Sequence, residues 1–195
     1  MTTSVSELMI EAGQKARAAS RRMAAASTAD KNKALLRLAE LLEAKKEDIF
    51  AANEQDLVRA KKNGLKESFV DRLRVTEKVL RLMAEGARQT AALPDPVGEI
   101  SEMRRRPSGI QVGRMRVPLG VLGIIYESRP NVTVDAACLA VKSGNACILR
   151  GGSEAFETNR ILGELVQQAL TETGLPTEAV QIAPTTCLLY TSDAA

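Results

Sequence analysis

The sequence predicts an α/β protein in which N-terminal helices precede half of a Rossmann-like parallel sheet. Over roughly the first ninety residues, apolar side chains recur at the spacing of amphipathic helices. From residue 119 onward, short apolar runs alternate with helical patterns, and strand–helix–strand connections of this length join parallel strands through right-handed crossovers. The runs account for only half of a doubly wound nucleotide-binding sheet. The sequence therefore predicts a truncated sheet.

Region 1–98 is predicted to be helical. A first helix is indicated by one apolar stripe, made of Val5, Leu8, Met9, Ala12, Ala16, Ala19 and Met23. Ser27 followed by Asp30 is typical of a helix start, because the acid lies near the positive end of the helix dipole. A second long stripe contains Leu35, Leu38, Leu42 and Ile49. Two further helices are predicted, from Asn53 to Gly64 and from Thr76 to the "PDP" at 94–96.

Region 99–118 is predicted to form a strand pair. Strand-like segments at 99–106 and 110–118 are separated by "PSG", which signals a turn. The densest basic cluster of the chain lies here and contains Arg104, Arg105, Arg106, Arg114 and Arg116. Such a cluster is typical either of a solvated strand face or of a surface that follows nucleic-acid phosphates.

Region 119–186 is predicted to be a partial nucleotide-binding βαβαβ unit. Its strands are expected at 121–126, 146–150 and 179–183, and its helices at 132–142 and 154–171. The tripeptide "SGN" should end the first of these helices, and "TGLP" should end the second, since glycine tolerates the left-handed conformation past a helix end.

The composition excludes several classes of function. The chain has no histidine, which excludes histidine acid–base catalysis and histidine–metal sites within it. Aromatic residues make up only 3%, which argues against stacking on nucleic-acid bases. The cysteines have no metal-ligand spacing, and no segment reaches the ~18 apolar residues of a membrane span. We therefore expect a reduced, cytoplasmic protein with no metal, nucleic-acid or membrane partner.

Two polar segments interrupt the apolar runs, each at the carboxyl end of a predicted strand. They are "YESRPNVT" at 126–133 and "LRGGSE" at 149–154. In open parallel sheets, ligands bind beyond the carboxyl ends of the strands, so both segments should face one ligand. A guanidinium suits a phosphate and a carboxylate suits ribose hydroxyls. The predicted cofactor-binding residues are Tyr126, Glu127, Ser128, Arg150, Gly151, Gly152, Ser153 and Glu154.

These segments also have a purely structural interpretation, as two strand-to-helix turns with ordinary helix caps. The chain contains no Gly-x-Gly-x-x-Gly in this region, so the usual dinucleotide fingerprint gives no support to a cofactor site. Residue types and spacing leave both interpretations open.

The stretch at 116–159, "RVPLGVLGIIYESRPNVTVDAACLAVKSGNACILRGGSEAFETN", resembles the glutamate-5-semialdehyde dehydrogenases, also called gamma-glutamyl phosphate reductases. These form a branch of the aldehyde dehydrogenase superfamily. The segments "DKNKALLRLAELLEAKKEDIFAANEQDL", "GLKESFVDRL" and "LPDPVGEI" are similar to the N-terminal region of the same family. The resemblance extends from about residue 6 to residue 186 and implies the aldehyde dehydrogenase fold.

The resemblance implies an NADPH-dependent reduction of gamma-glutamyl phosphate to glutamate 5-semialdehyde in L-proline biosynthesis. In this family a cysteine displaces phosphate to form a thioester, and that cysteine lies downstream, outside residues 1–195. The chain alone is therefore expected to be inactive. The resemblance also implies a homo-oligomer with the strand pair 99–118 at its interface. A non-catalytic nucleotide-binding module of the superfamily is the alternative, and a nucleic-acid binder that uses arginines 104–106 is a third hypothesis.

Asn131 is the predicted catalytic residue of this chain, by analogy with a superfamily asparagine whose amide faces the oxyanion. The same position suits an N-cap of the helix at 132–142. Arg150 stands where other superfamily members have a lysine, and a guanidinium can bind the 2′-phosphate of NADP bidentately. Cys138 on an apolar helix face and Cys147 inside a buried strand are predicted to be core residues.

The last segment, "CLLYTSDAA" at 187–195, departs from the family pattern. It is similar to translated sequencing-adapter read-through, so a non-native tail is expected there. Cys187 is accordingly left out of the predicted site.

Overall fold

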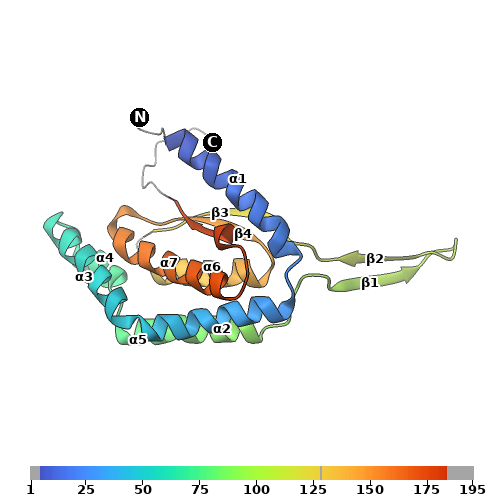
Figure 1. Ribbon diagram of the computed structural model, residues 1–195, viewed down its shortest axis with the longest axis horizontal. Coiled ribbons are helices and arrows are strands. Elements are labelled where there is room, and N and C mark those ends of the chain that lie inside the picture. The colour runs from blue at the N-terminus through green and yellow to red at the C-terminus, as the bar shows by residue number, and fades with distance from the viewer. Residues whose placement is uncertain (1–4, 128, 184–195) are drawn as a thin grey trace.

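The computed structural model describes residues 5–127 and 129–183 and has the predicted mixed α/β architecture (Figure 1). The helices in these residues are α1 (Val5–Ala24), α2 (Thr28–Ala44), α3 (Lys46–Lys62), α4 (Glu67–Leu73), α5 (Glu77–Ala92), α6 (Asn131–Lys142) and α7 (Phe156–Glu172). The strands are β1 (Ile100–Arg105), β2 (Gln111–Met115), β3 (Val121–Ile125), β4 (Ala146–Arg150) and β5 (Val180–Ile182). Short 3-10 turns, η1 (Ser153–Ala155) and η2 (Thr177–Ala179), precede α7 and β5. The expectations for Ser128 and for 187–195 lie outside the described residues.

Two predicted helix starts are confirmed by their caps. Ser27 Oγ accepts a hydrogen bond from Asp30 N at 3.1 Å, and Thr76 Oγ1 accepts one from Val79 N at 3.3 Å. Each hydroxyl satisfies a backbone N–H that has no partner within its own helix. The capping residues therefore define where α2 and α5 begin.

The predicted extent of the second stripe and the predicted start of the third helix are wrong, whereas the predicted end of the third helix at Gly64 (φ +70°) is confirmed. The stripe from Leu35 to Ile49 is divided at Lys45, whose backbone (φ −104°, ψ 23°) leaves the helical conformation between α2 and α3. Neither glycine nor proline marks this break, so the local sequence does not reveal it. Helix α3 begins at Lys46 rather than Asn53, and Asn53 lies on its buried face. The sequence pattern also does not predict α4, which has only seven residues.

The predicted parallel sheet is confirmed, with strand order β3–β4–β5. Helix α1 covers one face, helices α6 and α7 cover the other, and α2 and α5 pack behind α6 and α7 (Figure 1). The apolar core is continuous through these layers, and β4 lies buried at its centre. Strand β5 is shorter than the predicted 179–183, because the chain first forms the turn η2.

Glycines end both crossover helices, as predicted. Gly144 follows α6 with φ +70°, and Gly174 follows α7 with φ +79°. Both angles are in the left-handed region, which glycine adopts without the steric cost of a Cβ atom. The chain can therefore turn sharply from each helix into the next strand.

The predicted strand pair is an antiparallel hairpin of β1 and β2 that projects from the body of the molecule (Figure 1). Every residue of the two strands is exposed. The register shifts between Ser101 and Arg104, next to Glu102 with φ 55°. Large apolar side chains on or beside the strands are exposed, namely Ile100, Met103, Ile110, Val112 and Met115. An exposed group of this kind is typical of a protein–protein contact surface.

Strand β3 forms an open edge of the sheet. Among the described residues it pairs with β4 only. Apolar side chains on and before this strand are exposed, namely Val117, Leu119, Val121 and Ile125. An unpaired edge with exposed apolar side chains is a template for a further strand.

Candidate cofactor site

The structure brings the two predicted polar segments together at one edge of the sheet. Ile125 at the end of β3 pairs with Arg150 at the end of β4 in the parallel register. The next bond runs from Tyr126 N to Arg150 O at 3.0 Å, so the two segments leave the sheet side by side. The hairpin projects from the opposite end of the molecule (Figure 1).

The predicted cofactor-binding residues differ in exposure. Glu127 and Ser153 are exposed, Arg150, Gly152 and Glu154 are half-buried, and Gly151 is buried. These residues therefore include one guanidinium and two carboxylates that solvent reaches at least in part. These are groups that bind phosphates and sugar hydroxyls.

Tyr126 is held by an internal hydrogen-bond chain. Thr133 Oγ1 donates its single hydrogen to Asn159 Oδ1 at 2.8 Å, so the phenol of Tyr126 is the donor to Thr133 Oγ1 at 2.6 Å. Burial raises the pKa of the Tyr126 phenol, and the bond to Thr133 offsets part of that rise. The tyrosine thus joins the end of β3 to α6 and α7. The sequence gives no sign of Thr133 or Asn159, since polar residues inside helices are usually exposed.

Packing within the fold explains why residue 151 is a glycine. A Cβ atom at this position would lie 2.2 Å from Asn159 Nδ2 and 3.2 Å from the ring of Tyr126. Any larger residue at this position would displace the Asn159 side chain, because real Cβ contacts are essentially never this short. The glycine therefore lets the loop after β4 pack against α7 and the Tyr126 ring, whether or not a cofactor lies nearby.

Asn131 is the first residue of α6, and the capping interpretation is wrong. The N-cap position is Pro130, which makes no side-chain cap bond. Asn131 Nδ2 instead donates to Asp135 Oδ2 at 3.2 Å, one helical turn later. Burial raises the pKa of the Asp135 carboxyl, and the bond from Asn131 offsets part of this. An amide nitrogen has two hydrogens, so one remains for another acceptor.

A buried carboxylate binds the N-terminus of α7. Asp56, from α3, is fully buried and accepts bonds from Glu157 N at 3.2 Å and Thr158 N at 2.8 Å. These amides are the groups that a pyrophosphate takes at a Rossmann helix N-terminus, and here they are occupied. Asp56 therefore occupies these two amides of the first turn of α7.

Both described cysteines are buried, as predicted. Cys138 lies on the inner face of α6, and Cys147 lies in β4. Burial raises the pKa of each thiol to about 12, with the Asp135 carboxylate adding to the shift at Cys138. A thiol with such a pKa is almost entirely protonated near neutral pH and is not a nucleophile.

This burial leads to a labelling prediction. At pH 8, Cys138 and Cys147 should react with iodoacetamide at least about a hundredfold more slowly in the folded chain than in urea. The measurement is peptide mapping by mass spectrometry at several times. The same peptides labelled in urea provide the control. Equal rates in both conditions would mean that the thiols are accessible in the folded state.

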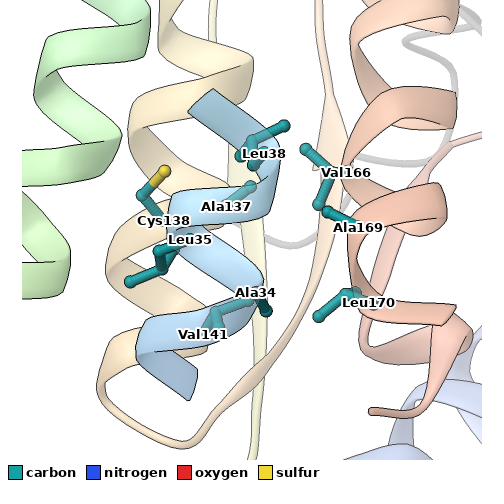
Figure 2. Close-up of a pocket in the computed structure, with 9 residues that line it drawn as sticks. All are labelled: Ala34, Leu35, Leu38, Ala137, Cys138, Val141, Val166, Ala169 and Leu170. Atoms are coloured by element: carbon teal, nitrogen blue, oxygen red, sulfur yellow. The ribbon is translucent and has the colours of Figure 1, made fainter. Parts of the chain in front are cut away.

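The small cavity in the core of the described residues does not suit a ligand. A gap of about 10 Å³ lies where α2, α6 and α7 meet, and only apolar side chains and Cys138 line it (Figure 2). It is too small and too apolar for a bound ligand, and it is a packing gap. A shallow hollow of about 330 Å³ lies between α5 and α6, with Asp135 and Leu139 in its wall.

A second open hollow, of about 680 Å³, lies beside two buried lysines. Lys31 pairs with Asp95 at 2.5 Å, and Lys142 Nζ donates to Asn32 Oδ1 at 2.6 Å and Ala91 O at 2.8 Å. Burial opposes ionisation of Asp95, but hydrogen bonds from Lys31, Thr28 and Val97 lower its pKa overall. Burial lowers the pKa of Lys142. These bonds join α2, the end of α5 with the loop after it, and the end of α6. The two buried lysines therefore stabilise the packing of these elements.

Two other kinds of site are not found within 5–127 and 129–183. No helix there combines the length and apolar character that a membrane span requires. No group of three or more histidine, cysteine, aspartate or glutamate side chains is arranged to hold a metal ion in that part of the chain.

A parallel βαβαβ unit with polar loops at the carboxyl ends of its strands is the architecture of a nucleotide-binding α/β protein. Residues 2–187 match the model of the aldehyde dehydrogenase family. The chain belongs to the aldehyde dehydrogenase family. Members of this family use NAD or NADP as cofactor, and they are oxidoreductases.

Solved structures of gamma-glutamyl phosphate reductases are similar to this chain. The enzyme from Thermotoga maritima is 41% identical, with a TM-score of 0.88, and the match covers 91% of this chain and 43% of that one. The enzyme from Saccharomyces cerevisiae is 32% identical, with a TM-score of 0.84, and the match covers 93% and 46%. This chain therefore spans less than half the length of either structure. A benzaldehyde dehydrogenase from Corynebacterium glutamicum, 24% identical with a TM-score of 0.69 over 93% of this chain and 36% of that one, shares the fold.

Proposed function

We propose that this chain contributes the first part of an NADPH-dependent gamma-glutamyl phosphate reductase, which forms glutamate 5-semialdehyde in L-proline biosynthesis. The observation that carries the proposal is the 41% identity and TM-score of 0.88 to the Thermotoga maritima reductase over 91% of this chain. Because this chain covers 43% of that structure, the activity is proposed for the longer protein.

The reaction requires a nucleophile that the described residues do not provide. We propose that a cysteine thiolate outside residues 1–195 attacks the acyl phosphate, releases phosphate and leaves a thioester. NADPH, when bound, supplies the hydride that reduces the thioester to the aldehyde and frees the thiolate. The described cysteines are excluded from this role by burial and by a pKa of about 12.

The residues of this chain have two proposed tasks. Arg150 and Glu154 bind the adenosine ribose, the guanidinium taking the 2′-phosphate and the carboxylate a hydroxyl, with Glu127, Gly152 and Ser153 in the adjoining loops. Their support is the pairing of Ile125 with Arg150, which places both loops at one edge. Ser128, which lies outside the described residues, was predicted for the same task.

Asn131 is proposed as the oxyanion donor. One hydrogen of its amide is bound by Asp135, which holds the side chain, and the other is available to the thioester oxygen. A donor already in place stabilises developing negative charge by about 3–4 kcal/mol.

The same proposal covers assembly and location. We propose a homo-oligomer in the cytoplasm whose interface includes the hairpin of β1 and β2. The support is the exposed apolar side chains of the hairpin and its projection from the body (Figure 1).

The function is tested with a chimera, in which residues 1–183 of this chain replace the matching part of the Thermotoga maritima reductase. The chimera should catalyse phosphate-dependent, NADP-dependent oxidation of glutamate 5-semialdehyde, the reverse reaction. A folded chimera without this activity would contradict the proposal. The unmodified Thermotoga maritima enzyme, assayed alongside, shows that the assay works.

Cofactor preference gives a separate prediction. Arg150→Ala should weaken NADPH binding by the full chain about tenfold or more and leave NADH binding nearly unchanged, because only NADPH carries the 2′-phosphate. Isothermal titration with both cofactors measures this. The control is Arg105→Ala, which removes the same charge from the exposed hairpin and should change neither affinity. Equal losses for both cofactors would show that Arg150 does not read the 2′ position.

A further inference from the structure

A buried carboxylate holds the helix that follows the proposed cofactor loop. Asp56 lies on α3 and is 0% exposed. Its Oδ1 accepts from Glu157 N and Arg59, and its Oδ2 accepts from Thr158 N at 2.8 Å and from Thr158 Oγ1 at 2.7 Å. Every donor that reaches it from α7 belongs to the first turn of that helix. A negative charge there is also favoured by the helix dipole.

Asn53, one turn earlier on α3, extends this network to the end of α4. Asn53 Nδ2 donates to Thr158 Oγ1 at 3.2 Å and to Leu73 O at 2.9 Å, and Oδ1 accepts from Val75 N at 2.9 Å. The Thr158 hydroxyl accepts from Asn53 and donates to Asp56. Both side chains are buried, so their bonds are not exchanged with water.

The network lies directly beside the loop that carries the proposed ribose-binding groups. The turn η1 (Ser153–Ala155) connects β4 to α7 and contains Glu154. Ala155 is fully buried in an apolar cluster with Leu57, Ala60, Val70 and Leu73 from α3 and α4. The turn is thus fixed at its end by apolar contact and just beyond it by Asp56. Its position is set by α3 and α4, about a hundred residues earlier in the chain, as well as by the sheet.

We propose that Asp56 is a positioning residue for the cofactor loop at 150–155, acting through Thr158 and the first turn of α7. This inference rests on the proposed function, since it takes the loop to bind the ribose end of NADPH. Asp56 does not touch the cofactor. It determines where Ser153 and Glu154 lie relative to Arg150, and a small displacement of such groups is enough to weaken a charged contact.

The test variant is Asp56→Asn in the full chain. Asparagine has the same shape but only one acceptor oxygen, so one set of donors faces an NH₂ group instead. We expect faster amide hydrogen exchange at 151–158 without nucleotide, and NADPH binding about tenfold weaker. The control is Met23→Ala, a core truncation on α1 near Gly144, at the opposite end of the sheet. At temperatures chosen for equal unfolded fractions, this control should retain wild-type exchange at 151–158 and wild-type NADPH affinity.

Two further variants, both at Thr158, test the same proposal if Asp56→Asn does not fold. Thr158→Val removes the hydroxyl between Asn53 and Asp56 and should weaken NADPH binding, whereas Thr158→Ser keeps the hydroxyl and should restore it. If the wild-type chain binds NADPH and neither Asp56→Asn nor Thr158→Val differs from Met23→Ala, the positioning role is wrong while the cofactor site stands. If the wild-type chain binds no NADPH, the proposed cofactor site fails, and the positioning role fails with it.

Discussion

Residues 1–195 alone should show no phosphate-stimulated oxidation of glutamate 5-semialdehyde, whereas the chimera should turn over. The thioester requires a thiolate. With a pKa of about 12, each described thiol is ionised to only about one part in ten thousand at pH 8. Burial also keeps the substrate away from both sulfur atoms. The measurement is NADPH formation by absorbance, with the chain at high concentration.

Three cysteine variants identify the source of any residual activity. Activity of the chain that disappears in Cys138→Ser, Cys147→Ser or Cys187→Ser would place the nucleophile within these residues and contradict the proposal. A chimera that binds NADPH without turnover would instead favour the non-catalytic nucleotide-binding module. These two outcomes can be told apart, because residual activity is measured on residues 1–195 alone, whereas NADPH binding without turnover is measured on the chimera.

Asn131→Ala in the chimera should lower kcat about a hundredfold or more, since one oxyanion donor is lost. Thermal stability should hardly change. Pro130 makes no side-chain cap bond to α6. Among the described residues, the side-chain bond found for Asn131 is the one to Asp135, a pair of a kind worth about 0.2–0.5 kcal/mol. The KM for NADP should also remain near its original value, because this residue is assigned to the oxyanion. Steady-state kinetics and a melting curve on the same preparation provide all three quantities.

Asp135→Ala is the matched control. It removes the partner of the Asn131 amide but leaves the amide itself, so kcat should fall by much less than in Asn131→Ala. A kcat within about threefold of the parent in Asn131→Ala would show that another group stabilises the oxyanion. A loss of stability without a loss of kcat would make Asn131 a structural residue of α6.

Local patterns predicted most of the fold. Amphipathic spacing located the long helices, and Ser27 and Thr76 marked two helix starts because a hydroxyl there binds the helix's own amide. Alternation of apolar runs with helices predicted the parallel sheet, whose strands then had to carry both polar segments to one edge. The break at Lys45 was missed, because its backbone angles arise from packing and no turn-forming residue accompanies them.

The sequence predicted that the two polar segments lie at one edge of the sheet, but it did not predict the contacts of their side chains. Arg150 and Tyr126 do adjoin each other, through a backbone bond at 3.0 Å. The phenol of Tyr126, however, is hydrogen-bonded to Thr133, and the absence of a Cβ atom at Gly151 allows Asn159 to pack against the loop. Neither role follows from the polar character of the segments, since the first depends on the packing of α6 and the second on the packing of α7.

The sequence by itself determined the fold class, the sheet edge where the polar loops meet, and the burial of Cys138 and Cys147. These properties follow from residue type and from periods of two or 3.6 residues, which act over a few neighbours. Only the tertiary structure decided that Asp56 and Asn53 bind the first turn of α7, and that Asp56 occupies two amides of this turn. Those hydrogen bonds join residues about a hundred positions apart. The donors of a buried carboxylate such as Asp56 are brought to it by the packing of α3 against α7, and local sequence patterns do not predict that packing.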